Sequence, residues 1–165
     1  MKFAFGERER YVFSSYSGLD NIFFGKGGFK IQQLIEELKL DHAELSDLFR
    51  KIVHLGIKSE EGRKTLNDAK AILLAHLKKE DDELYPVLCE TAKDNQNLKL
   101  KLESLANDLG NVTKTISAFF EKYADGEHET NFKTDFQKIY LVLTKRINSE
   151  ERELFPEYDK IVFSR

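Results

Sequence analysis

The sequence predicts an all-α protein whose main body is an antiparallel up-and-down four-helix bundle. From residue 30 onward, apolar residues recur every three or four positions in four segments, which is the spacing of amphipathic helices. No segment alternates apolar and polar residues for long enough to indicate a strand. Turn signals separate the four segments, and short connections between long helices favour antiparallel neighbours. A chain of 165 residues has room for one such domain.

Residues 1–29 differ in composition from the rest of the chain, and we predict that they form an N-terminal extension. Eight aromatic residues fall in this stretch, together with five of the nine glycines. Aromatic side chains bury large areas, so we expect the extension to pack on the bundle of residues 30–165. A cap or an arm that binds a partner is the alternative.

The first helix is predicted over residues 30–55 and ends at Gly56, a residue type that commonly follows the last helical turn. The second helix begins after Ser59, whose side chain is suited to cap a helix N-terminus. This helix runs toward Pro86, which we expect to kink or end it because proline lacks the backbone N–H group.

The third helix is predicted from about Asp94 to the Asp125–Gly126 break, and the fourth runs from about Phe132 to Pro156. The second and fourth helices end alike, because HLKKEDDELYP of residues 76–86 corresponds to RINSEERELFP 70 residues later. The chain therefore resembles a duplicated helical hairpin. The duplication would place one group of core residues, His42, His76 and Glu80, opposite a second group, Thr113, Arg146 and Glu150.

Composition and charge exclude several classes of function. The chain has 26 basic and 29 acidic residues, so no overall positive field attracts nucleic acid or an anionic membrane surface. No apolar run approaches the roughly 20 residues of a membrane span, and residues 7–10 are charged where a signal peptide would be apolar. We therefore expect a cytoplasmic protein without a nucleic-acid or membrane partner. The single cysteine, Cys89, excludes an internal disulfide and a zinc site made of thiolates.

Ionisable residues stand at core positions of the predicted helices, where leaving them unpaired would be costly. His76 and Glu80 are four residues apart, so they share one helix face, with Cβ atoms about 6 Å apart. His42 could join them from the neighbouring helix. Two imidazoles and a carboxylate suit iron, zinc, manganese or another divalent first-row metal better than calcium or magnesium. The alternative is a histidine network satisfied within the core. His54 and His128 are expected at the surface and in a linker.

The motif of residues 76–86, His-x-x-x-Glu followed by an acidic run and Leu-aromatic-Pro, resembles the hemerythrin-like, or HHE cation-binding, family. Leu40-Asp41-His42 and residues 150–156 are similar to further parts of its signature. The resemblance covers about residues 30–160. It implies a four-helix bundle that holds a non-haem di-iron centre through five histidines and two bridging carboxylates. It also implies that the protein binds oxygen or senses oxygen, iron or redox state.

The ligand set implied by the resemblance is incomplete in this chain, which has only four histidines. One iron would be held by His42, His76 and the bridging Glu80, and Glu150 or Glu151 could represent the second carboxylate. Thr113 and Arg146 stand where further histidines would be expected. The guanidinium of Arg146 would repel a cation, and it could pair with Glu80 or Glu150.

The sequence therefore predicts a degenerate, mononuclear metal site, with His42, His76, Glu80 and Glu150 as its candidate ligands. Iron is the expected metal, with zinc or another divalent ion as alternatives, and oxygen is an example of a small ligand. The expected role is binding, sensing or regulation, without enzyme activity. The competing hypothesis is a metal-free bundle in which Arg146 replaces the metal and which acts as a protein-interaction or regulatory module. A di-iron oxidase or peroxidase would need histidines from a partner chain.

Overall fold

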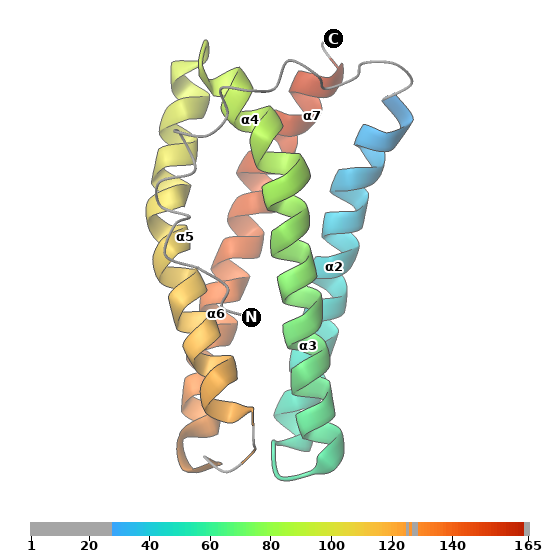
Figure 1. Cartoon of the computed structure of the whole chain (residues 1–165), viewed down its shortest axis with the longest axis vertical. Coiled ribbons are helices and arrows are strands. Elements are labelled where there is room, and N and C mark those ends of the chain that lie inside the picture. Colours follow the sequence, from blue (N-terminus) through green and yellow to red (C-terminus); the bar gives the residue numbers. More distant parts are fainter. Residues whose placement is uncertain (1–27, 125, 127–128, 164–165) are drawn as a thin grey trace.

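The part of the chain that the structure describes is helical throughout. The computed structural model describes residues 28–124, 126 and 129–163, and no strand occurs in these ranges. The long helices lie side by side along one axis (Figure 1). The all-α prediction is therefore confirmed. Residues 1–27, nearly all of the expected N-terminal extension, lie outside the described residues.

The first half of the chain forms two long helical segments. Helix α2 spans Gly28–Leu55 and ends at Gly56, whose φ of 63° lies in the left-handed region that glycine adopts without strain. Helix α3 spans Glu60–Lys79, and the Ser59 hydroxyl accepts a hydrogen bond from the Gly62 N–H, as predicted for an N-cap. The segment continues as a π-helix, η2 (Glu80–Leu84), and then as α4 (Tyr85–Ala92).

The second half repeats this plan. Helix α5 spans Gln96–Tyr123, and the Asn95 side chain accepts a hydrogen bond from the Leu98 N–H at its start. A short 3-10 helix, η3 (Glu129–Asn131), precedes α6 (Phe132–Ser149). The π-helix η4 (Glu150–Leu154) and helix α7 (Phe155–Phe163) complete the segment. The two π-helices are 70 residues apart, as the duplicated sequence motif predicts.

Of the two outcomes predicted for Pro86, a kink or a helix end, the helix end is wrong, because the chain stays helical through Pro86 to Ala92. Pro86 lies in the first turn of α4, which continues directly from η2, so its missing N–H group leaves out one backbone hydrogen bond of the continuous helix. The preceding turn widens instead, and the Tyr85 N–H donates to the Glu80 carbonyl oxygen, five residues back. The same bond joins Phe155 to Glu150 before Pro156. The prolines therefore produce π-turns rather than helix ends.

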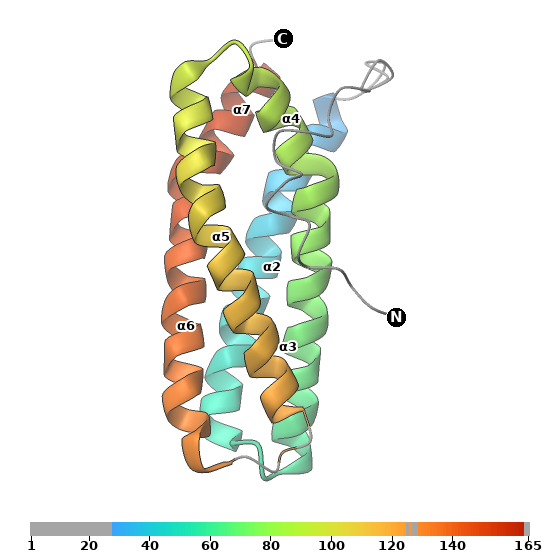
Figure 2. The same cartoon turned by 60° about the vertical axis from the view of Figure 1, so that its left-hand side comes forward.

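The helices pack as a bundle in which each segment contacts its neighbours along the chain. Helix α2 packs on α3, α4 packs on α5, and α5 packs on α6, while α2 also contacts α6 and α7 (Figures 1 and 2). The chain reverses direction at each connection between long segments (Figure 1). No helix in the described residues combines the length and apolar character needed to cross a bilayer.

The core consists of two apolar clusters. One extends toward the 56–59 connection and contains Leu45, Leu73 and Leu143. The other extends toward α4 and α7 and contains Leu38, Leu84 and Leu154. Between the clusters lies a set of six buried polar residues, which we call the polar layer: His42, His76, Glu80, Thr113, Arg146 and Glu150. The candidate functional residues therefore share one level of the bundle.

Candidate metal centre

The polar layer brings the predicted site residues together in a nearly dry environment. His42 comes from α2 and His76 from α3, and each is 2% exposed. Glu80 and Glu150 are the first residues of the two π-helices and are 0% and 2% exposed. Groups with so little access to water are costly unless each has a partner, so their mutual geometry decides what the layer can do.

The two imidazoles face each other through their Nε2 atoms, which are 3.2 Å apart. Glu150 Oε2 lies 3.1 Å from His42 Nε2, and Glu80 Oε1 lies 3.7 Å from His76 Nε2. One ligand atom from each of His42, His76 and Glu150 lies within 4.8 Å of the other two. Glu80, which the sequence places beside His76, lies at the edge of this tighter group. Two nitrogens and carboxylate oxygens thus surround one point, as in a metal site of mixed donors.

The outer nitrogen of each imidazole is held by a carboxylate. His42 Nδ1 lies 2.8 Å from Glu151 Oε1, and His76 Nδ1 lies 3.3 Å from Asp41 Oδ2. An ionised carboxylate can only accept a hydrogen bond, so each Nδ1 carries a proton, and the Nε2 atom of a neutral ring is left with a free electron pair. Such outer carboxylates orient metal-binding histidines and make them better ligands.

Sequence reasoning did not assign an orienting role to Asp41 or Glu151. Both residues are adjacent in sequence to predicted ligands, since Asp41 precedes His42 and Glu151 follows Glu150. The pairing crosses between helices, however, because Asp41 binds the histidine of α3 and Glu151 binds the histidine of α2. Their positions next to predicted ligands make Asp41 and Glu151 candidates for this role, but these positions do not indicate which imidazole each carboxylate contacts.

Arg146 lies in the same layer and contacts both buried carboxylates. Its Nη2 donates a hydrogen bond to Glu80 Oε2 at 2.5 Å, and its Nε lies 2.6 Å from Glu150 Oε1. The expectation that this guanidinium pairs with Glu80 or Glu150 is therefore confirmed for both. Thr113, from α5, is also buried, at 7% exposure.

The two histidines differ in their protonation. Burial lowers the pKa of His76 to about 4, with a further contribution from the charge of His42, so His76 is neutral near pH 7. Burial also acts to lower the pKa of His42, but hydrogen bonds to Glu150 and Glu151 outweigh it and raise the pKa above 6.5. A proton on His42 Nε2 lies within hydrogen-bond distance of two acceptors, Glu150 Oε2 at 3.1 Å and His76 Nε2 at 3.2 Å. A metal ion would replace that proton.

The two carboxylates also differ. Burial and the charge of Glu150 raise the pKa of Glu80 well above its usual range, although Arg146 opposes the shift. Burial acts to raise the pKa of Glu150, but Arg146 and His42 lower it below the ordinary value. Without a metal, burial therefore favours a proton on Glu80, whereas Arg146 and His42 favour an ionised Glu150. A bound metal ion would add a second positive charge beside Arg146, and this charge would favour ionisation of both carboxyl groups.

A second, independent observation indicates that the donor set fits a metal ion. Glu80 Oε1 and both carboxylate oxygens of Glu150 are buried without a hydrogen-bond partner of acceptable geometry. Buried polar atoms are nearly always hydrogen-bonded, so the unpaired Glu80 Oε1 beside two imidazoles indicates a missing cation or polar group. The two Glu150 oxygens already have ion-pair contacts, with Arg146 Nε at 2.6 Å and with His42 Nε2 at 3.1 Å. His42, His76 and Glu150 would hold the metal, with Glu80 next to them.

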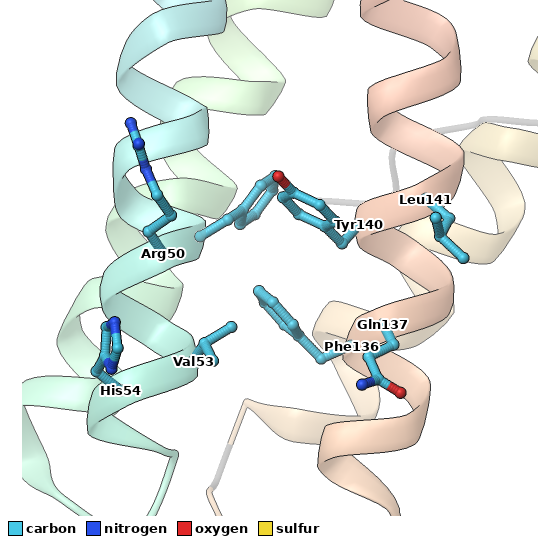
Figure 3. A pocket seen from close by; sticks show the side chains of 8 residues that line it. Arg50, Val53, His54, Phe136, Gln137, Tyr140 and Leu141 are labelled. Carbon is cyan, nitrogen blue, oxygen red and sulfur yellow. The ribbon is translucent and has the colours of Figure 1, made fainter.

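His54 does not join this group. His54 lines an open groove of about 410 Å³ between α2 and α6, whose remaining lining residues include Phe136 and Tyr140 (Figure 3). No carboxylate lines the groove. This hollow therefore lacks the donor set of a metal site. His128 lies outside the described residues.

Comparison with known proteins yields one match. A family model described as the Hemerythrin HHE cation binding domain matches residues 33–158. The matched range contains the whole polar layer and both π-helices. No curated protein and no solved structure matches the chain significantly.

Proposed function

Because the chain belongs to the hemerythrin HHE cation-binding domain family, we propose that it binds a single first-row transition metal ion, iron foremost, in the polar layer. His42, His76 and Glu150 would be the primary ligands, and Glu80 would be the fourth. When bound, the metal would supply a Lewis-acidic or redox-active centre with coordination positions open to a small molecule such as oxygen.

The observation that carries this proposal is the convergence of two imidazole nitrogens 3.2 Å apart, each backed by a carboxylate on its other nitrogen. A purely structural histidine pair would need only one hydrogen bond between the rings. The carboxylates of Asp41 and Glu151 would fix both rings with Nε2 toward the same point. A nearby guanidinium favours one metal over two, because it adds a fixed positive charge to the layer.

The role we propose is binding, sensing or regulation rather than enzyme catalysis. Arg146 holds Glu80 and Glu150, the two buried carboxylates that could otherwise transfer protons. The reversal of the chain at each connection supports the antiparallel up-and-down topology that we propose for the bundle (Figure 1). A cytoplasmic location and an N-terminal extension packed on the bundle remain predictions from the sequence.

A second candidate function rests on the double pairing of Arg146. Its guanidinium could serve as the permanent internal cation of a metal-free bundle, which would act through its surface as an interaction or regulatory module. The close contacts of Arg146 with Glu80 and Glu150 favour this reading. It leaves the facing imidazoles and the unpaired Glu80 Oε1 unexplained.

Metal content distinguishes the two candidates. We expect elemental analysis of protein purified without an affinity tag to find about one metal ion per chain, either as isolated or after anaerobic loading with ferrous iron and dialysis. A protein that retains no iron, zinc or manganese under these conditions would exclude the first proposal and support the second. Two equivalents would contradict a mononuclear site.

Metal affinity is expected to increase as the pH rises through the raised pKa of His42, above 6.5. Binding must displace the His42 Nε2 proton and the proton of Glu80, whose pKa is also raised. Each displaced proton makes the apparent affinity change about tenfold per pH unit while the group is still protonated in the metal-free protein. Titration calorimetry in buffers of different ionisation enthalpy would count one to two released protons. A pH-independent affinity with no proton release would contradict this assignment.

A further inference from the structure

Tyr85 has a buried hydroxyl group for which the proposed metal ligands do not account. Its hydroxyl is buried and has no hydrogen-bond partner. Its ring packs against the apolar cluster that contains Leu84 and Leu154. Leaving a hydroxyl unpaired in such surroundings costs about 1–3 kcal/mol, so the position is expected to serve a partner.

The π-turn explains how this hydroxyl comes to the polar layer. The Tyr85 N–H bonds to the Glu80 carbonyl oxygen, so five residues complete one widened turn. In a regular α-helix, residues five apart point in different directions, whereas the π-turn brings Tyr85 close to the face of Glu80. The charged groups that act on the Tyr85 hydroxyl include Glu80, Arg146 and Glu150, all three from the polar layer.

The second hairpin lacks this hydroxyl. Phe155 occupies the position equivalent to Tyr85, and its ring stacks on the His42 imidazole with centroids 5.7 Å apart and planes 10° apart. The apolar ring packs against one side of the site, and the phenol brings an O–H group toward the layer from the other hairpin. At this position the two copies of the motif differ by one atom, the phenol oxygen.

The net charge of the metal-loaded site indicates which kind of ligand the Tyr85 hydroxyl would bind. With Glu80 and Glu150 ionised, the guanidinium of Arg146 and a divalent metal leave one net positive charge in a buried space. One small anion would neutralise it. A tyrosine hydroxyl can donate one hydrogen bond to such an anion.

We propose that Tyr85 is a positioning and specificity residue whose O–H group donates a hydrogen bond to a small anion bound at the metal. This inference rests on the metal site proposed above. Arg146, which acts electrostatically on the hydroxyl, would supply a second attraction for the anion. Because Phe155 has no hydroxyl, only Tyr85 of the two equivalent residues can donate this hydrogen bond, and the anion would therefore be held in one orientation.

The test measures azide binding to the iron(III)-loaded full chain through its visible absorption, in the unmodified protein and in the Tyr85→Phe variant. We expect both proteins to hold about one iron, and the Kd for azide to rise about five- to tenfold in Tyr85→Phe, the loss of one hydrogen bond. Tyr140→Phe is the matched control, because it removes the same atom from a partly exposed ring on α6. Its Kd for azide should be unchanged.

Three results would overturn the inference. An azide Kd equal in Tyr85→Phe and the unmodified protein would exclude the hydrogen bond while leaving the metal site intact. Loss of iron from Tyr85→Phe, together with a phenolate-to-iron absorption band present only in the unmodified protein, would make Tyr85 a ligand rather than a donor. Failure of the unmodified protein to bind iron or another first-row metal would overturn the proposed function itself, and this inference with it.

Discussion

The His76→Ala variant is expected to lose the metal while keeping the bundle folded. His76 is one of three proposed primary ligands, and changes in outer-shell partners alone typically lower metal affinity 10- to 100-fold. Removing the ligand itself should weaken binding by more than about 100-fold, so the metal content should fall from about one per chain to background after dialysis. Elemental analysis of the dialysed variant would measure this loss of metal.

The fold should tolerate this change because His76 is neutral near pH 7, so its removal deletes no buried charge. Its outer partner Asp41 still accepts a hydrogen bond from Lys79 at 3.0 Å. His76→Gln, which preserves most of the volume, serves as a second variant if the alanine leaves too large a cavity. His54→Ala removes an imidazole from the groove on α2 and is the matched control. Full metal retention by His76→Ala and His76→Gln would contradict the site.

The Arg146→Ala variant is expected to destabilise the metal-free protein by about 3–5 kcal/mol, the usual cost of removing one partner from a buried ion pair. Its guanidinium compensates the charge of Glu150 and donates a hydrogen bond to Glu80, and both side chains are almost entirely buried. Without it, these acids face each other unpaired. Denaturant unfolding in the presence of a chelator would measure the loss.

Arg50→Ala provides the control for this change, because Arg50 pairs with Asp47 on the surface of α2 and its side chain is 69% exposed. Exposed pairs contribute little, so the unfolding midpoint should hardly move. Arg146→Lys retains the charge but loses the planar fork that reaches both carboxylates, and an intermediate stability is expected. An Arg146→Ala protein as stable as Arg50→Ala would contradict the ion-pair assignment.

Added metal makes the Arg146→Ala experiment informative about function. If the layer binds a metal, a saturating first-row ion should restore part of the lost stability, because ligands that bind only the folded state stabilise it by mass action. If Arg146 is the only cation the bundle accepts, the same ion should have no effect on the unfolding midpoint. The two proposed functions thus predict opposite outcomes from one titration.

Helix periodicity and capping residues were enough to predict the helical segments. Ser59 caps α3 and Gly56 ends α2 as predicted, because both effects depend on local backbone chemistry. Pro86 was the exception. The sequence shows that proline removes one N–H group, but whether the chain ends, kinks or forms a π-turn depends on the packing of the residues around it. Here the chain remains helical because the turn before Pro86 widens, and the Tyr85 N–H donates to the Glu80 carbonyl oxygen.

The sequence by itself determined that His42, His76, Glu80, Arg146 and Glu150 occupy core positions, because residue spacing sets the helix face on which a side chain lies. Only the tertiary structure decided that the two Nε2 atoms meet and that Glu150 lies within 4.8 Å of both imidazoles. It also decided that Asp41 contacts the His76 ring and Glu151 the His42 ring. Spacing fixes position along one helix. Distances between side chains on different helices depend on helix rotation, relative height and rotamer choice, which only the packed core sets.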